Sequence, residues 1–308
     1  MNHKKKLAIV IPAYKSTFIK ETLDSISHQS CKDFTLYIGD DCSPYELYSI
    51  IEPYKTKLNI VYKRFDTNLG GKDLVAQWER CIDMTEGEQY IWLFSDDDVM
   101  DINCVEKFYE AIKQNPNAGL LHFNINKIND KSEQMYSFRP WPKYCSTKEY
   151  IDGKLGAKGY ISFVVEFIVR KDIYMKCGGF ENFDLAWGSD FVSWVKFSDA
   201  ANGIITIDEA NVNWRESNEN ISPNRNPQII YRKLKSVILY TKWISDFAKN
   251  KRYGKRWFYS KFALGELRRN KNILSKTEFN NILGFYSKIN NVNLFCHYLL
   301  IFLYRYCL

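Results

Sequence analysis

Short apolar runs alternate with stretches of helical spacing along the first 125 residues of the chain. The runs are rich in β-branched and aromatic side chains, as buried strands are, and they lie at Leu7–Ile11, Phe34–Gly39, Leu58–Lys63, Tyr90–Phe94 and Gly119–Asn124. Between them, apolar residues recur three or four positions apart, as in Ile19, Leu23 and Ile26. The alternation predicts an α/β fold with a Rossmann-like, mostly parallel sheet and helices on both faces.

The pattern becomes less regular from about residue 127 to residue 226. An apolar run at Ile161–Val169 predicts another strand, and the spacing from Asp190 to about Ala200 predicts a helix. The remaining residues read as helices rich in Lys, Arg and aromatic side chains, and they end in an apolar tail, NLFCHYLLIFLYRYCL. We therefore expect a domain over residues 1–226 and a helical C-terminal extension over residues 227–308.

The net charge of the chain changes sign at about the same boundary, near residue 227. Residues 228–308 carry 16 Lys and Arg against 3 Asp and Glu, a net charge of +13, whereas residues 1–227 carry 27 against 33, a net charge of −6. Such asymmetry indicates a polyanionic partner, either an anionic membrane surface or a nucleic acid. No apolar run is long enough to predict a membrane-spanning helix, and Leu7–Ile11 is too short for a signal peptide.

Cysteine and histidine spacing excludes a zinc site of the usual kinds. The eight cysteines include no C-x-x-C pair, and the four histidines include no H-x-x-x-H pair. We expect free thiols. Familiar nucleotide signatures are missing too, because there is no G-x-G-x-x-G, and Gly71-Lys72 is followed by Asp73 where a phosphate-binding loop needs Ser or Thr.

Carboxylates instead gather where the predicted strands end. Asp40 and Asp41 follow the second run, and three consecutive aspartates, Asp96–Asp98, follow the fourth. The carboxyl ends of parallel strands meet at one edge of a sheet, where ligands bind. Adjacent buried carboxylates repel, so we expect a hard divalent cation, Mg²⁺ or Mn²⁺, to offset their charge. Asp41 could alternatively cap a helix that begins near Pro44. One of Asp96–Asp98 could cap a helix that starts near Asn103, but three aspartates exceed any need for capping.

A further acidic residue lies far along the chain, after a Gly178-Gly179 turn at which we expect positive φ. Asp190 begins a predicted helix. It could interact only with the helix dipole, or it could serve as a general base that is held rigidly at the helix start.

Four segments in this order, AIVIPAYKS, LYIGDDCSP, WLFSDDDV and CGGF with WGSD, resemble the inverting family 2 glycosyltransferases, which have the GT-A fold. The resemblance covers roughly Leu7 to Ser222. It implies a nucleotide-sugar-binding half over residues 1–125 and an acceptor-side half over residues 126–226. It further implies that the donor is bound by Pro12, Ala13, Tyr14, Asp41, Lys72 and Asp96. The implied metal ligands for Mn²⁺ or Mg²⁺ are Asp97 and Asp98, and the implied catalytic base is Asp190.

The chain departs from the family pattern at three positions. Ser95 stands where many relatives carry the first acid of the metal motif, Ser189 replaces the acid before the base, and Ser217 replaces a histidine. The Q-x-x-R-W signature of processive members is absent, which favours the addition of one sugar. Arg80 or Lys72 could assist the leaving diphosphate.

The resemblance implies a transferase that moves one sugar from a nucleotide-diphosphate donor, a UDP-sugar, to a hydroxyl of a glycan or lipid-linked glycan during surface polysaccharide biosynthesis. Trp187 could stack on the acceptor or pack in the core. Residues 228–308 could bind an anionic membrane or form a basic cap on the catalytic half. We expect a cytoplasmic protein, peripheral on the inner face of the plasma membrane, that binds no nucleic acid. The alternatives are a nucleotidyltransferase and a non-catalytic nucleic-acid- or sugar-binding protein.

Overall fold

The computed structural model describes residues 5–156, 158–254, 256–293, 296 and 299, and the chain divides into two compact units. We call residues 1–181 and 193–217 the sheet unit, and residues 182–192 and 218–308 the helical unit. The chain therefore passes from one unit to the other three times, after residues 181, 192 and 217. The seven described cysteines are free thiols, as expected.

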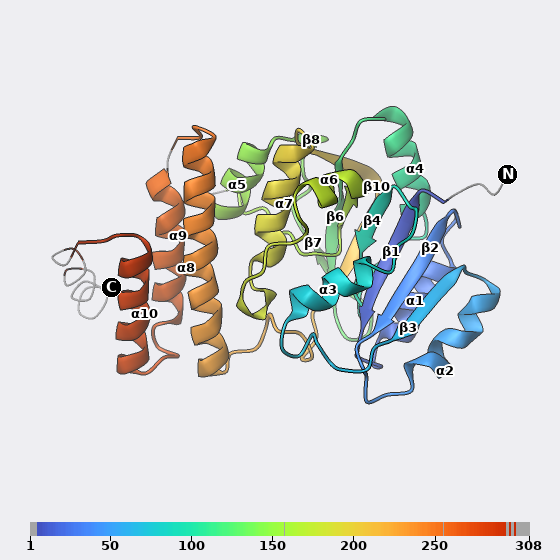
Figure 1. Ribbon diagram of the computed structural model, residues 1–308, viewed down its shortest axis with the longest axis horizontal. Helices are drawn as coiled ribbons and strands as arrows, with labels where there is room; N and C mark the ends of the chain where they lie inside the picture. Colours follow the sequence, from blue (N-terminus) through green and yellow to red (C-terminus); the bar gives the residue numbers. More distant parts are fainter. Residues whose placement is uncertain (1–4, 157, 255, 294–295, 297–298, 300–308) are drawn as a thin grey trace. The chain divides into compact units, whose positions relative to one another are not determined.

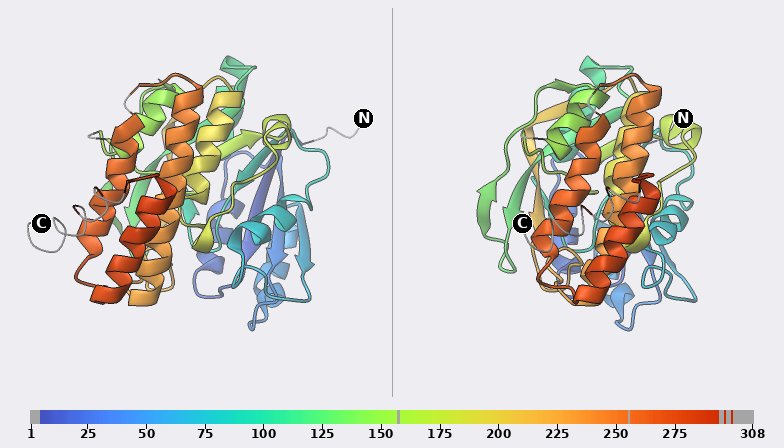
Figure 2. Two further views of the ribbon diagram at one scale, coloured as in Figure 1. Left: turned by 60° about the vertical axis from the view of Figure 1, so that its left-hand side comes forward. Right: turned by 90° about the vertical axis from the view of Figure 1, so that its left-hand side faces the viewer.

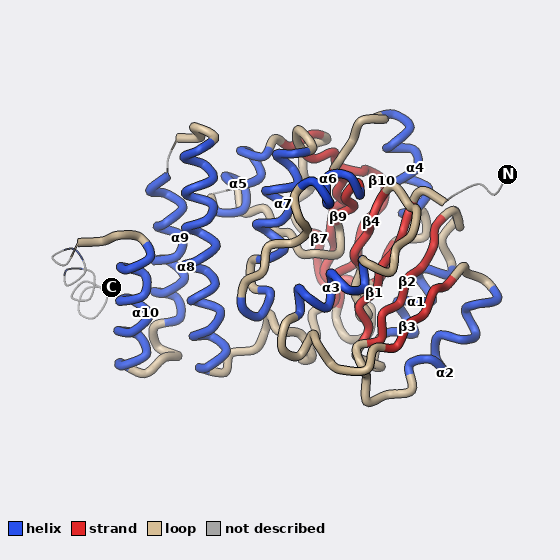
Figure 3. Tube along the Cα trace, in the orientation of Figure 1, coloured by secondary structure: helices blue, strands red, loops and turns tan. Residues whose placement is uncertain are grey.

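Within the described residues, ten strands of the sheet unit form one sheet, drawn in red in Figure 3. Its order is β3-β2-β1-β4-β9-β6-β10-β5, with β7 added to β6 and β8 added to β10. The strands are β1 Leu7–Ala13, β2 Phe34–Asp40, β3 Ile60–Arg64, β4 Tyr90–Leu93, β5 Val99–Met100, β6 Leu120–Ile128, β7 Gln134–Ser137, β8 Tyr144–Cys145, β9 Phe167–Arg170 and β10 Ile204–Arg215.

One end of the sheet, formed by β3, β2, β1 and β4, is parallel. Strands β3, β2, β1 and β4 run parallel, β9 is antiparallel to both β4 and β6, and β10 is parallel to β6. The carboxyl ends of β1, β2 and β4 consequently lie at the same edge, as the sequence predicts.

Helices cover both faces of the sheet, which confirms the predicted α/β architecture (Figure 1). On one face, Ile9 of β1 and alternate residues of its neighbours pack in one core with α1 Ile19–Ser27, α2 Leu47–Ile51 and α4 Cys104–Gln114. On the other face, α3 Leu74–Ile82 lies so close to β2 that a Cβ at Gly39 would overlap the sulfur of Cys81. The remaining helices of the unit are η1 Glu52–Thr56, α5 Thr147–Leu155 and α6 Lys171–Lys176.

The predicted strand at Ile161–Val169 is wrong in its first half, because β9 begins only at Phe167. The backbone before it is bonded by side chains instead of a strand ladder. The N–H of Phe163 donates to the Glu166 carboxylate at 2.7 Å, and the Trp92 indole donates to the carbonyl of Val165 at 2.6 Å. Apolar side chains mark this segment as buried, but they do not show which groups satisfy its backbone.

The helical unit contains α8 Pro227–Asn250, α9 Arg256–Asn270 and α10 Lys276–Ile289, which lie side by side in Figures 1 and 2. Asn226 caps α8 by accepting the N–H of Gln228 at 2.9 Å, and Ser275 with Glu278 forms a capping box on α10. The predicted helical extension is therefore confirmed where the chain is described. Most of the apolar tail after Asn293 lies outside the described residues. No helix among those described is long and apolar enough to cross a membrane.

The helical unit also contains residues 182–192, with the short helix η2 Asp184–Ala186 and the first turn of α7 Ser189–Ala200. Nothing in the sequence pattern indicates that this segment groups with the C-terminal helices. The functional division of residues 1–226 into a donor half and an acceptor half stays a prediction.

Candidate functional site

The loops after β1 and β4 are joined by the first aspartate of the acidic run. Oδ2 of Asp96 accepts the backbone N–H groups of Tyr14 and Lys15, both at 2.8 Å. The loop after β2 joins the same edge, because the N–H of Asp41 donates to the carbonyl of Ala13 at 2.8 Å. The structure thus brings Ala13, Tyr14, Asp41 and Asp96 together, while Tyr14 keeps 40% of its surface exposed.

A lysine lies among the aspartates. The ammonium of Lys15 forms a close ion pair with Oδ2 of Asp97 and lies 3.7 Å from Oδ1 of Asp96. Its side chain is 27% exposed, whereas those of Asp96 and Asp97 are 6% and 7% exposed. The ammonium of Lys15 therefore lies on the more exposed side of the acidic cluster.

Asp98 is turned inward and is 2% exposed. Its Oδ1 accepts the backbone N–H of Arg215 at 2.6 Å, and its Oδ2 lies 2.6 Å from the Ser95 hydroxyl, which also lies 2.9 Å from Oδ1 of Asp97. Ser95 is thus an organising hydroxyl within the cluster. Asp98 as a metal ligand stays a prediction, and of the three aspartates it fits that role least, because it is the most deeply buried and neither of its oxygens faces Lys15.

Arg215 lies beneath the cluster and is fully buried. Its guanidinium donates to the carbonyls of Asp97 and Asn129 at 2.7 and 2.9 Å, pairs with Glu21 at 2.6 Å, and lies 4.3 Å from the ring centroid of Phe18. Charge-assisted hydrogen bonds of this kind hold the backbone of the acidic turn in place.

Burial and mutual repulsion decide the charge state of the aspartates. Burial raises the pKa of Asp96 and of Asp98 above the usual range, and the neighbouring Asp97 adds to both shifts. The positive charge of Lys15 opposes them. Burial acts to lower the pKa of Lys15, but Asp96 and Asp97 outweigh it and raise the pKa, so Lys15 is an ammonium at neutral pH.

The oxygens that face the Lys15 ammonium fit a cation. They are Oδ1 of Asp96 and Oδ2 of Asp97, and the ammonium stands in for a positive ion between them. Hard divalent ions bind such carboxylate oxygens together with substrate phosphates. In the described part of the chain, no group of three or more His, Cys, Asp or Glu side chains is arranged to hold a metal, so a bound ion would need oxygens from a ligand as well.

Asp41 does not cap the next helix, because that helix, α2, begins at Leu47 without a side-chain cap. Its carboxylate instead accepts the N–H groups of Leu69 and Gly70 at 2.7 and 2.8 Å and pairs closely with Arg80. Each carboxylate oxygen has two acceptor positions, so Oδ2 keeps one for a donor such as a base N–H. Of the other two predicted donor ligands, Lys72 is exposed and Pro12 is half-buried.

The segment before α7 is held on α8 within the helical unit. Nε and Nη2 of Arg232 donate to the carboxylate of Asp184 at 2.8 and 2.6 Å, and the hydroxyl of Ser236 donates to its carbonyl at 2.9 Å. Gly188 has φ of +87°, and a Cβ there would overlap the ring of Tyr240. The segment that carries Trp187 and Asp190 is therefore tied to the first helix of the basic extension.

Asp190 lies in the first turn of α7 and is half-buried. The neighbouring Ser189 is buried, and its hydroxyl accepts the N–H of Phe183 at 2.9 Å. Asp190 and Trp187 belong to the helical unit, whereas Asp96–Asp98 and Ser217 belong to the sheet unit. The assignment of Asp190 as catalytic base stays a prediction.

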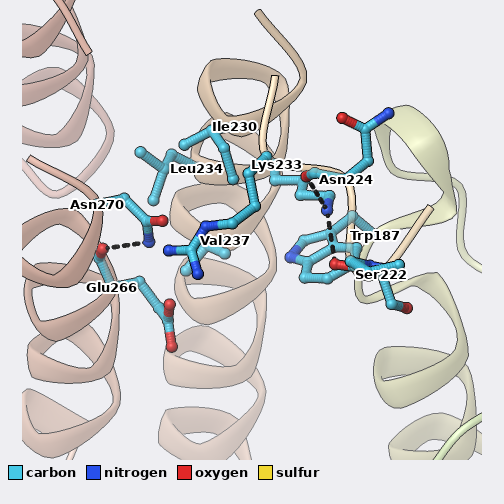
Figure 4. Close-up of a pocket in the computed structure, with 11 residues that line it drawn as sticks. Trp187, Ser222, Asn224, Ile230, Lys233, Leu234, Val237, Glu266 and Asn270 are labelled. Atoms are coloured by element: carbon cyan, nitrogen blue, oxygen red, sulfur yellow. Dashed lines mark hydrogen bonds between the residues drawn. The ribbon is translucent and has the colours of Figure 1, made fainter. Parts of the chain in front are cut away.

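A cavity of about 210 Å³ lies inside the helical unit (Figure 4). Trp187 lines it together with Arg225, Lys233, Glu266 and Asn270. The ammonium of Lys233 lies 4.4 Å from the ring centroid of Trp187 and donates to the carbonyls of Ile221, Ser222 and Asn224. The cavity combines an aromatic face with carboxylate, amide and guanidinium groups, which suits a polyhydroxylated ligand.

Comparison with known proteins identifies the family. Residues 8–175, more than half of the chain, match the family described as Glycosyl transferase family 2. This chain belongs to glycosyl transferase family 2.

Curated relatives agree with this assignment. The chain is 26% identical over 176 residues to an uncharacterized glycosyltransferase of Haemophilus influenzae, which covers 56% of this chain and 55% of that protein. It is 32% identical over 95 residues to TarS of Staphylococcus aureus, a poly(ribitol-phosphate) beta-N-acetylglucosaminyltransferase, covering 30% of this chain and 16% of that protein. The family 2 chain thus matches about half of the Haemophilus protein and a small part of TarS.

Solved structures confirm the predicted GT-A fold. The crystal structure of S. aureus TarS residues 1–349 in complex with UDP-GlcNAc is similar to this family 2 chain with a TM-score of 0.62 and 16% identity, covering 96% of this chain and 86% of that TarS chain. The mannosyltransferase PcManGT from Pyrobaculum calidifontis, in complex with GDP-Man and Mn²⁺, is similar with a TM-score of 0.54 and 12% identity, covering 98% and 85%.

The sequence pattern alone does not indicate two residues of the cluster in this family 2 chain, Lys15 and Arg215. Lys15 directly follows the strand-end motif Pro12–Tyr14, so a basic residue at the edge that collects the aspartates is the signal for it. Arg215 has no such signal, because only the pairing of β10 with β5 and β6 brings it beneath Asp97.

Proposed function

We propose that this chain is an inverting glycosyltransferase that moves one sugar from a nucleotide-diphosphate donor, preferentially a UDP-sugar, to a hydroxyl of a glycan or lipid-linked glycan. We place this step in the building of a surface polysaccharide. Family membership supports glycosyl transfer over the two alternative classes, nucleotidyl transfer and simple binding. The observation that carries the proposal is the cluster at the carboxyl edge of β1, β2 and β4, where outward oxygens of Asp96 and Asp97 face a cation.

The donor is assigned to this edge. Pro12 and Ala13, the last residues of β1, and Tyr14, which follows them, would hold the base and ribose. Asp41 has one acceptor position left for a base N–H. The complex of TarS with UDP-GlcNAc supports a UDP-sugar as the donor. The complex of PcManGT with GDP-Man is the reason to test GDP-sugars as well.

Metal dependence is part of the proposal. Asp96 and Asp97 would hold a Mn²⁺ or Mg²⁺ ion, and the Mn²⁺ in the PcManGT complex supports this choice. A bound ion supplies Lewis-acid stabilisation of the departing diphosphate. Asp98, Ser95 and Arg215 keep the two carboxylates in position.

Asp190 is assigned as the general base. The acceptor oxygen attacks the anomeric carbon, the bond to the diphosphate breaks on the opposite face, and the acceptor proton passes to the Asp190 carboxylate. Its anchored segment supports this role, because general bases act within hydrogen-bond reach and so need fixed geometry. Trp187, which lines the cavity of the helical unit, would contact the acceptor sugar.

An anionic membrane surface is the proposed partner of residues 228–308. Lys251, Arg252, Arg268 and Arg269 are exposed there, and clustered basic residues bind anionic lipids. The inner face of the plasma membrane stays the predicted location.

Deleting residues 228–308 would also remove α8, which supports the segment that carries Asp190. A point variant is therefore the better test of membrane binding. The double variant Arg268→Gln, Arg269→Gln should float less with anionic vesicles than the parent chain, and neither should float with neutral vesicles. A parent chain that ignores anionic vesicles contradicts this part of the proposal.

A donor panel tests the function itself. Calorimetry with UDP-, GDP- and dTDP-sugars in the presence of Mn²⁺ should show binding of one nucleotide class. In a turnover assay, the free nucleoside diphosphate should form from that donor by transfer of the sugar to an acceptor or to water. Asp97→Asn should weaken the binding, whereas Asp208→Asn, a change at an exposed aspartate, should not. A folded chain that binds no member of the panel refutes the proposal.

A further inference from the structure

The side chain of Lys15 occupies the position between two carboxylates that a divalent ion would need. Its ammonium pairs closely with Oδ2 of Asp97 and lies 3.7 Å from Oδ1 of Asp96. These contacts join Lys15 to the aspartates across more than 80 residues of sequence.

The other oxygens of the cluster already have protein donors. Oδ2 of Asp96 accepts two backbone N–H groups, Oδ1 of Asp97 lies beside the Ser95 hydroxyl, and both oxygens of Asp98 are bonded inward. The two oxygens that face Lys15 are therefore the ones best placed for a metal, and Lys15 must leave them before an ion can bind at full strength.

Charge balance indicates when Lys15 leaves. Asp96, Asp97 and Lys15 together carry about one negative charge when all are ionised. A divalent ion alone would turn this into a net positive charge beside a displaced ammonium, whereas a diphosphate that arrives with the ion supplies compensating negative charge. A lysine has a flexible four-carbon stem and a compact charge, so it can move from a carboxylate to a phosphate oxygen.

We propose that Lys15 is a placeholder cation that keeps the divalent metal out until the nucleotide diphosphate arrives, and that it then pairs with the diphosphate. The inference rests on the proposed function, because the ligand that draws Lys15 away is the donor. Lys15 thereby couples metal binding to donor binding: each ligand binds weakly alone and strengthens the other by the same factor.

Three variants separate charge from structure. Lys15→Gln removes the charge and keeps the backbone N–H that Asp96 accepts, and Lys15→Arg keeps both. Lys20→Gln is the matched control, because Lys20 is an exposed lysine of the neighbouring helix α1 whose partner is Asp24. Thermal unfolding shows whether each variant is folded.

The experiment titrates Mn²⁺ alone, followed by electron paramagnetic resonance of the free ion, and then repeats the titration with saturating UDP. In the parent chain, in Lys20→Gln and in Lys15→Arg, UDP should strengthen Mn²⁺ binding at least about tenfold. Lys15→Gln should bind Mn²⁺ alone about tenfold more tightly than the parent chain, and UDP should then add less than about threefold.

Equal affinity of the parent chain and Lys15→Gln for Mn²⁺ alone would overturn the proposal. So would a parent chain that binds Mn²⁺ equally well with and without bound UDP, a result that needs no variant. Failure of every nucleotide to bind, with or without metal, would instead refute the proposed function, and the titration with Mn²⁺ alone would still decide whether Lys15 holds the ion out.

Discussion

The acidic cluster of the sheet unit and the Asp190 segment of the helical unit are built in opposite ways. The cluster follows largely from local sequence, because three aspartates come directly after a buried strand and bond to Ser95 and to the loop after β1 at 2.6 to 2.9 Å. The Asp190 segment has few local signals. It takes its shape from α8, through Asp184 with Arg232 and through Gly188 against Tyr240.

The difference shows which parts of the site depend on long-range packing. A strand end in a parallel sheet defines its own position, so the residues that follow it can be assigned from sequence. A segment that is held by a residue 48 positions later cannot be assigned in this way, because neither Asp184 nor Arg232 carries a sequence signal for the other. Helix α8 of the basic extension therefore supports the segment that carries the proposed catalytic base.

Removing the arginine beneath the cluster should have the largest effect on stability. Arg215→Met leaves the carbonyls of Asp97 and Asn129 without their donor, whereas Glu21, which is 45% exposed, regains water. We therefore expect a loss of about 2 to 4 kcal/mol in the free energy of unfolding. Chemical denaturation measures it, with Arg139→Met as an exposed control. A loss no greater than the control's would show that the cluster does not depend on Arg215.

A glycine substitution tests how far the Asp190 segment depends on α8. Gly188→Ala combines an unfavourable positive φ with overlap of the Tyr240 ring, so we expect it to cost about 2 to 3 kcal/mol and to reduce turnover while nucleotide affinity is unchanged.

The matched control for this change is Gly178→Ala, which has φ of +73° but open space around the added Cβ. It should cost only about 1 kcal/mol through the backbone. Equal losses in the two variants would mean that Tyr240 does not hold the segment.

A buried histidine gives a smaller, pH-dependent effect within the sheet unit. The ring of His122 stacks on Trp141 with the centroids 4.0 Å apart, and neither ring nitrogen has a hydrogen-bond partner among the described residues. Burial lowers the pKa of His122 to about 3. The unfolded chain takes up a proton near pH 6.5 and the folded chain does not, so stability falls as pH drops below about 6.5. At pH 5 the loss is about 2 kcal/mol.

Melting temperatures at pH 7 and pH 5 measure this effect. His122→Leu should lose less stability between these values than the parent chain, whereas His28→Leu, at an exposed site, should behave like the parent. An identical loss in His122→Leu would show that another group is responsible.

The sequence predicts the fold class, the first strands and helices, and the meeting of Asp41 and Asp96 with the loop after β1, because period and strand-end chemistry are local properties. It does not predict Lys15 as the partner of Asp97, since a lone lysine shows no partner until the edge is assembled. The late start of β9 and the burial of Arg215 depend on side-chain bonds to the backbone from distant elements. Periodicity carries no information about such bonds.

The central claim is that the sheet unit binds the donor and that Asp190 performs the chemistry. Donor affinity and turnover, measured side by side for Asp190→Asn and Asp97→Asn, test it most directly. We predict that Asp190→Asn keeps the donor affinity of the parent chain and loses about 10²- to 10⁴-fold in turnover, whereas Asp97→Asn weakens donor binding itself. Parent-like turnover in Asp190→Asn, or parent-like affinity in Asp97→Asn with Mn²⁺ present, would contradict the account.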